Sequence, residues 1–320
     1  MENVLLLGNG LNLNLYGNRV PDWAQLFQDD DKKPLLRNYT FLYEKCLLKS
    51  RKQDNEFKQS IVNSFIDVIK PDNIDNAREK GVFEFGQKLE ESKISDVLTT
   101  NVDFGIESIL KEVNGFKESE DKWVSEKIYS IRRKKQFYND EYKVNVWKIH
   151  GDAEKIETVS LGFDQYCGSL SKIESYVKGT YKIKDKQAEE LHKNKDKEKQ
   201  VLSIKNKFEK NSFDEISWIE LFFRKNIYIA CLGMDLSEID LWWILNKRKR
   251  FIEDGVKINN KITFLYSEYD TGERKENKAE KAVKEQDFKE KLIMFDAFGV
   301  ETKRIPGDNT MLTSVFEQIS

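Results

Sequence analysis

Four groups of residues have the types and spacing needed for catalysis or ligand binding: Gly8-Asn9-Gly10 with Asn12, Thr99-Thr100-Asn101-Val102-Asp103, His150-Gly151, and Gly233-Met234-Asp235-Leu236-Ser237. A glycine-rich turn can cradle a phosphate on its main-chain N–H groups. Histidine titrates near neutral pH and is the commonest general base. Together the groups predict a site for a phosphate-bearing substrate with one histidine to move a proton.

Each group also has a purely structural interpretation. Gly8 and Gly10 can make a tight turn, since the third glycine of a dinucleotide fingerprint and the lysine of a P-loop are absent. Asn101 and Asp103 can cap a helix that starts near Phe104. Ser237, Glu238 and Asp240 can cap a helix in the same way, and a lone histidine is more often structural than catalytic.

The elements that position these groups are six short apolar runs at residues 3–7, 94–98, 144–149, 227–232, 262–266 and 300–304. Most are apolar throughout, which is typical of strands buried on both faces of a parallel sheet. Helical patterns lie between them, so the expected fold is α/β, a Rossmann-like parallel six-stranded sheet with helices on both faces. Ligands bind such sheets at the carboxyl ends of the strands, where all four groups fall.

Two insertions interrupt the alternation within what we predict to be one domain over residues 1–320. Residues 35–93 carry helical spacing, for example at Phe57, Ile61 and Phe65, and indicate an inserted helical layer. Residues 178–215, rich in lysine over 178–210, indicate a charged helical insertion. Residues 116–145 are expected to form a charged hairpin or loop that leads into the strand before His150.

The composition narrows the class of protein. The chain has 54 Lys+Arg against 56 Asp+Glu, a net charge of −2, so no general attraction to nucleic acid or anionic membrane is expected. No apolar stretch is long enough to span a bilayer, and no signal peptide is recognisable at Met1-Glu2-Asn3. The three cysteines are scattered without a C-x-x-C pair, which predicts no metal, no disulfide framework and a cytoplasmic protein.

The joint order of these motifs resembles the sirtuin (silent-information-regulator) superfamily, and more closely the bacterial sirtuin-like domains of anti-phage defence systems. The motifs are Gly-x-Gly near the start, Thr-Thr-Asn-x-Asp, His-Gly, and Gly-x-x-x-Ser-x-x-Asp, and they span roughly residues 1 to 305. The stretches Pro21 to Leu26 and Leu161 to Tyr166 are also similar to that branch. The phage abortive-infection H family shares a similar Gly-Asn-Gly opening.

The resemblance implies NAD⁺ as substrate and a role for each group. It implies that Gly8, Asn9, Gly10 and Asn12 bind the pyrophosphate, although Asn12 stands where sirtuins usually have serine. Asn101 would position water and the ribose hydroxyls, Asp103 would hold that loop and the nicotinamide end, and His150 would be the general base. Thr100 would be a further cofactor-binding residue. Gly233, Asp235 and Ser237 would close on the ribose and phosphate, with Ser267 near the adenosine end.

The possible activities differ in the group that accepts the ribose once nicotinamide has left. Sirtuin deacylases usually carry a four-cysteine zinc ribbon, which this chain lacks. The expected activity is therefore an NAD⁺ glycohydrolase that forms nicotinamide and ADP-ribose or cyclic ADP-ribose, and depletes NAD⁺ during phage infection. The alternatives are a sirtuin-type deacylase or ADP-ribosyltransferase, a non-catalytic NAD or ADP-ribose sensor, and a structural or nucleic-acid-binding module.

Such an activity has to be held off in a healthy cell. The sirtuin-like core and its insertions take up nearly all 320 residues, so we expect control by self-assembly or by a partner defence protein, such as an ATPase or a nucleic-acid-guided protein. The candidate docking surfaces are the helical layer, the lysine-rich insertion and Trp242-Trp243, for which burial against the sheet is the competing interpretation.

Overall fold

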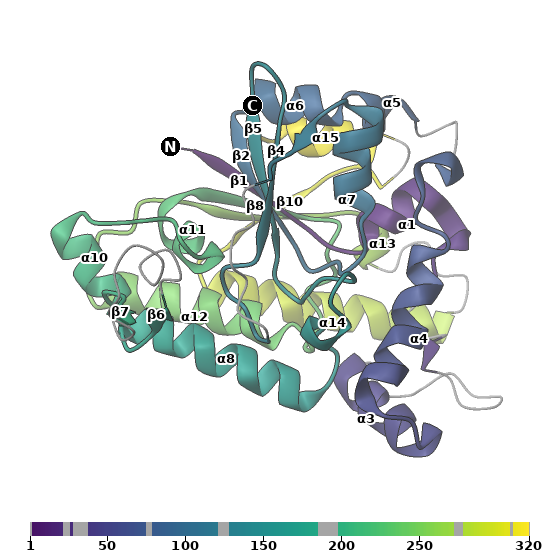
Figure 1. Ribbon diagram of the computed structural model, residues 1–320, viewed down its shortest axis with the longest axis horizontal. Coiled ribbons are helices and arrows are strands. Elements are labelled where there is room, and N and C mark those ends of the chain that lie inside the picture. The colour runs from purple at the N-terminus through teal and green to yellow at the C-terminus, as the bar shows by residue number, and fades with distance from the viewer. Residues whose placement is uncertain are drawn as a thin grey trace.

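Six parallel strands form the larger part of one mixed sheet in the computed structural model (Figure 1). The structure describes residues 2–21, 26–27, 38–74, 79–120, 128–184, 198–271, 278–307 and 310–319. The parallel strands are β1 (Asn3–Leu7), β2 (Ile94–Thr99), β5 (Lys143–Lys148), β8 (Asn226–Ala230), β9 (Ile262–Tyr266) and β10 (Glu301–Arg304). The prediction of an α/β fold is confirmed, with strand limits within two residues of the apolar runs.

The prediction of a wholly parallel sheet of six strands was wrong. In the described part of the chain the sheet has eight strands, because β3 (Lys117–Glu118) and β4 (Lys134–Tyr138) add to β5 in antiparallel fashion. Charged residues obscured β4 in the sequence, since only Phe137 of this strand is fully buried. The region expected to be a charged hairpin therefore covers the edge of the sheet, and its lysines suit an edge strand.

The order of the strands is β10-β9-β8-β1-β2-β5-β4-β3. Along the chain, the parallel strands build outward from β1 through β2 to β5, and then restart on the other side of β1 with β8, β9 and β10. The direction of winding thus reverses between β1 and β8. In open α/β sheets this switch point leaves a crevice at the carboxyl ends of the two strands, where ligands bind.

Helices cover both faces of the sheet because successive strand residues point in opposite directions. In β1, Leu5 and Leu7 join one hydrophobic cluster and Val4 and Leu6 join the other. The first cluster is covered by α1 (Gly10–Tyr16), α3 (Tyr39–Ser50), α4 (Asp54–Ile66), α5 (Glu79–Phe83), α6 (Phe85–Glu91), α7 (Gly105–Ser108), which continues as a π-helical turn, and α15 (Met311–Glu317).

The second face carries α8 (Phe163–Lys178), α10 (Ile204–Lys210), α11 (Trp218–Arg224), α12 (Ile239–Glu253) and α14 (Lys278–Ala297), while the short α13 (Glu268–Thr271) follows β9. In Figure 1, α8, α12 and α14 run together beneath the sheet. Trp242 of α12 packs on Phe295 and Phe298, and Trp243 is half-buried. Both tryptophans are partly buried and pack against the second cluster, so the burial interpretation holds in part for each of them.

The two insertions differ in their secondary structure. Helices α3 to α6 occupy most of residues 35–93, as the helical spacing predicts. The prediction of a helical insertion over 178–215 was only partly right. Its described residues form the antiparallel pair β6 (Lys182–Lys184) and β7 (Glu198–Gln200) before α10, because Tyr181 and Ile183 pack on the second cluster at the two-residue period of a strand.

No helix within the described ranges is both long enough and apolar enough to cross a membrane.

Candidate functional site

The glycine-rich turn after β1 lies against the loop after β8, at the switch point of the sheet. The main-chain N–H of Gly10 donates to the carbonyl of Cys231 over 2.8 Å. A Cβ on Gly10 would lie 2.6 Å from that carbonyl oxygen, and a Cβ on Gly8 would lie 2.5 Å from Leu232 Cδ1. Both glycines are therefore required by the close approach of the two loops, with or without a ligand.

Asn12 and Asp103 join the end of β1 to the end of β2. Asn12 is 1% exposed, and its Nδ2 donates to Asp103 Oδ2 over 2.9 Å and to Asn9 Oδ1 over 3.0 Å. The other carboxylate oxygen of Asp103 accepts from the main-chain N–H of Gly105 over 2.8 Å. Asp103 thus holds its own loop to helix α1, and the Asn12 amide is engaged inside the protein.

Asn101 sits beside this link, with 8% of its surface exposed. Its Nδ2 donates to the Gly8 carbonyl over 3.3 Å, and its main-chain N–H donates to Thr99 Oγ1 over 3.0 Å. The neighbouring Thr100 donates its main-chain N–H to the Leu7 carbonyl over 3.2 Å. Predicted residues from the first two strand ends therefore interlock into one polar cluster.

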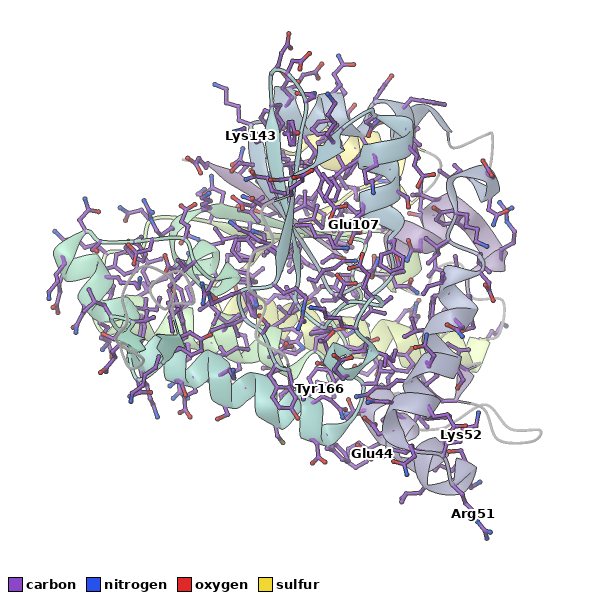
Figure 2. All side chains as sticks on the ribbon, viewed as in Figure 1. Glu44, Arg51, Lys52, Glu107, Lys143 and Tyr166 are labelled. Atoms are coloured by element: carbon purple, nitrogen blue, oxygen red, sulfur yellow. The ribbon has the colours of Figure 1, made fainter. Side chains whose placement is uncertain are left out.

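A buried ion pair that the sequence reasoning missed lies beneath this cluster. Lys148 Nζ, at the end of β5, is 2.8 Å from Glu107 Oε1 of α7, and both side chains are almost fully buried. The same ammonium donates to the main-chain carbonyl of Asp103 and lies 3.5 Å from that of Asn101. Burial raises the pKa of Glu107 although Lys148 opposes it. Glu107 is labelled in Figure 2. The sequence feature that could have indicated this ion pair is Lys148, a lysine inside the apolar run before His150.

His150 follows β5 and is 6% exposed. Its Nε2 lies 3.0 Å from Asp240 Oδ2 and 3.6 Å from Glu238 Oε2. Tyr166 of α8, labelled in Figure 2, packs edge-on against the imidazole with ring centroids 5.4 Å apart. Gly151 turns the chain away with a φ of +106°, where an added Cβ would be 2.3 Å from the Thr158 carbonyl oxygen. The His-Gly order therefore has a steric cause.

The surrounding carboxylates decide the charge of His150. Burial acts to lower its pKa, but Asp240 and Glu238 outweigh that effect and raise the pKa of His150 to about 9. Burial together with Asp240 and Asp235 raises the pKa of Glu238 to about 7, against the opposing charge of His150. Burial also raises the pKa of Tyr166, so this phenol stays neutral. At neutral pH the imidazole in this structure is a cation paired with Asp240.

The loop after β8 is held partly by a different element. Lys291 of α14 donates to the Gly233 carbonyl over 2.7 Å and to Asp235 Oδ1 over 2.6 Å, while Trp242 Nε1 donates to the Asp235 carbonyl over 3.2 Å. Ser237 is 7% exposed. Within the described residues, no hydrogen bond joins Gly233, Asp235 or Ser237 to Asn101 or His150.

Ser267 lies at the carboxyl end of β9, and both its main-chain N–H and its hydroxyl bond to Asp270 Oδ2, over 2.8 and 3.1 Å. A shallow surface hollow of about 610 Å³ adjoins it, lined by Glu268, Arg304, Ile305 and Pro306. This hollow is lined by residues at or just after the ends of the outer strands β9 and β10, and none of the candidate residues around His150 lines it.

His150, Glu238 and Asp240 form the one group in the described ranges with the donors and spacing of a metal site. One ligand atom from each lies within 4.8 Å of the others. A divalent cation there would have to replace the proton that now joins His150 to Asp240. The absence of a metal stays a prediction from the sequence.

In the comparisons with known proteins, no protein-family model and no curated protein matches this chain.

Proposed function

We propose that the chain is a sirtuin-like NAD⁺ glycohydrolase on a Rossmann-like fold. The observation that carries the proposal is the interlock at the switch point. There the Gly8–Gly10 turn meets Cys231, Asn12 bonds to Asp103, and Asn101 bonds to Gly8. His150 follows β5, the neighbour of β2 in the sheet. The residue before it, Ile149, donates its main-chain N–H to the Thr99 carbonyl at the end of β2 over 2.9 Å. A dinucleotide in the crevice would lie along this edge with its ribose near Asn101 and His150.

The reaction needs little from the protein beyond orientation and charge control. The bond between C1′ of the ribose and the pyridinium nitrogen breaks, and both electrons remain on nitrogen as neutral nicotinamide. Water adds its oxygen to C1′ and gives up one proton. Asn101 orients the water and the ribose hydroxyls, and the neutral form of His150 accepts the proton and returns it to solvent. The two carboxylates beside His150 offset positive charge at C1′ in the transition state.

The product and the biological role belong to the same proposal. Water as acceptor gives ADP-ribose, and capture of C1′ by the adenine ring gives cyclic ADP-ribose. Either reaction consumes cellular NAD⁺, which fits an effector of anti-phage defence that acts by NAD⁺ depletion.

A non-catalytic NAD-binding sensor is the second candidate, and one observation favours it. His150 is a cation at neutral pH, with its Nε2 bound to Asp240. A protonated imidazole cannot accept a proton, but it can bind an anionic group such as a phosphate. The two candidates differ in what happens to bound NAD⁺.

Binding and cleavage measured on one preparation test the proposal. Purified protein is titrated with NAD⁺ by calorimetry, then incubated with NAD⁺ and assayed for nicotinamide, ADP-ribose and cyclic ADP-ribose by chromatography. We expect cleavage, and a loss of roughly 10²–10⁴ in rate for Asn101→Ala and for His150→Ala. The exposed Asn63→Ala and the second histidine, His192→Ala, are matched controls. Wild-type rates in both site variants refute the assignment, and binding without cleavage identifies a sensor.

A further inference from the structure

The contact between His150 and Asp240 joins the two halves of the sheet. Asp240 lies in the first turn of α12, which follows β8, and His150 follows β5. In the sheet β1 and β2 lie between these strands. The segment after β8 therefore passes the carboxyl ends of β1 and β2, and this path brings the Asp240 carboxylate to the imidazole of His150. A contact across the switch point lies where the substrate of the proposed function would bind.

Helix capping does not account for the acidic residues at this helix start. Helix α12 begins at Ile239, and the side chain of its N-cap, Glu238, makes no capping hydrogen bond. Asp240 Oδ1 accepts from the main-chain N–H of Leu241 over 2.9 Å, but both carboxylate oxygens also face His150 Nε2, with Oδ2 nearer at 3.0 Å and Oδ1 at 3.3 Å. Asp240 is 1% exposed, and burial of a carboxylate is costly without a charged partner. His150 is that partner.

The pairing also fixes which nitrogen of His150 is available. Nε2 is bound to Asp240, and within the described residues no group hydrogen-bonds to Nδ1. The charged and titratable groups around the ring are Asp240 on α12, Glu238 before α12, and Tyr166 on α8. Tyr166 packs edge-on to the imidazole and restricts its rotation. Glu238 Oε2, at 3.6 Å, is too far for a hydrogen bond and acts only through its charge.

We propose that Asp240 is the positioning residue of His150. Its carboxylate accepts a hydrogen bond from Nε2–H, which keeps the proton on Nε2 and presents Nδ1 to the substrate. This inference rests on the proposed function, because it assigns the atom of His150 that takes the proton from water. The imidazole then works as in other histidine–carboxylate pairs, in which the carboxylate selects the tautomer and orients the ring. Glu238 has no part in selecting the tautomer.

Replacement of Asp240 by asparagine should reverse the tautomer. Oδ1 of the side chain stays with the Leu241 N–H, so the new NH₂ group takes the place of Oδ2 and donates to Nε2. Nε2 then loses its proton to Nδ1 in the neutral ring. Glu238→Gln is the matched control, because it changes a neighbouring carboxylate that makes no hydrogen bond to the ring.

Nitrogen-15 NMR of imidazole reads the tautomer directly. The chain has two histidines, so His192→Gln leaves His150 as the single imidazole signal. Above pH 10, where the ring is neutral, we expect a proton on Nε2 in this background and with Glu238→Gln, and on Nδ1 with Asp240→Asn. A proton on Nδ1 in the His192→Gln background overturns the inference even if Asp240→Asn does not fold. An unchanged tautomer in folded Asp240→Asn overturns it as well.

Kinetics separate this inference from the proposed function. For NAD⁺ cleavage at a pH above the break of each variant, where His150 is neutral in all of them, we expect kcat to fall roughly 10²–10⁴-fold in Asp240→Asn with KM little changed, and by a smaller factor in Glu238→Gln. Equal losses in the two variants contradict a positioning role. If the wild-type protein cleaves no NAD⁺, the proposed function fails whatever the tautomer is.

Discussion

Substitution of Asp240 by asparagine should remove a pH-dependent part of the free energy of unfolding, so that the difference between wild type and variant changes with pH in a defined window. The folded protein raises the pKa of His150 from 6.5 to about 9. A raised histidine pKa stabilises the fold fully below pH 6.5, and that stabilisation is lost as the pH rises through about 9. Each pKa unit corresponds to about 1.4 kcal/mol, which gives about 2–3 kcal/mol at pH 7 and almost nothing by pH 9.5.

Asp240 supplies the hydrogen bond and the larger of the two attractive charges, so the variant should lose most of this stabilisation. The assay is urea denaturation followed by tryptophan fluorescence, for wild-type and variant protein at pH 7, 8, 9 and 9.5. We expect the variant to be less stable by up to about 2–3 kcal/mol at pH 7 and the difference to close as the pH rises. The change in the difference, rather than its absolute size, isolates the ion pair from any packing defect.

Asp235→Asn provides the matched control. This carboxylate belongs to the same loop but pairs with Lys291. Its difference from wild type should stay level over the same pH values. A constant difference for Asp240→Asn would show that His150 does not carry the charge argued for here, and a slope of equal size in the control would assign the effect to the loop as a whole.

Four further predictions follow from the site and its surroundings. First, kcat/KM for NAD⁺ should rise about tenfold per pH unit from pH 7 toward 9, because neutral His150 is the active form; Asp240→Asn should move the break to lower pH, and a flat profile refutes the role of His150 as base. Second, Gly10→Ala should lower stability by about 1–3 kcal/mol in urea denaturation, since the new Cβ would be 2.6 Å from the Cys231 carbonyl oxygen. Gly81→Ala, with its nearest neighbour at 3.5 Å, is the control and should be close to neutral. Third, elemental analysis should find no stoichiometric metal in the purified protein, and acetylated peptides should keep their acetyl groups in the presence of NAD⁺; zinc at one equivalent would contradict this. Fourth, cellular NAD⁺ should stay level when the chain is expressed alone and fall on phage infection or with its partner, so a steep fall from the chain alone would exclude external control.

The strands β1, β2 and β9 could be predicted because they are buried on both faces. Runs such as Val4 to Leu7 carry no polar residue, and a continuous apolar run between turns has few other structures open to it. Strand β4 could not be predicted from its sequence in the same way. Four of its five residues are at least partly exposed and only Phe137 is fully buried, so its composition is that of a loop.

The candidate site could be predicted only where it follows the strand ends. Asn12, Asp103 and Asn101 interlock because parallel strands bring their carboxyl ends to one edge. The partner of His150 could not be found in this way. Asp240 lies 90 residues further along the chain, and its place at the start of a helical pattern indicates a helix cap. Only the path of the chain after β8 brings it to the imidazole of His150.

The order in which the strands appear along the chain has a consequence for synthesis on the ribosome. β1 to β5 are complete when His150 has been made, and β8 is the next strand of this sheet to follow. Until β8 emerges, β1 is an edge strand whose Val-Leu-Leu-Leu run has unpaired N–H and C=O groups along one side. The nascent chain therefore carries an apolar edge open to chaperones or to aggregation. During the same interval His150 has no Asp240, so under the positioning inference a chain still on the ribosome, or one cut short before α12, lacks the residue that orients His150.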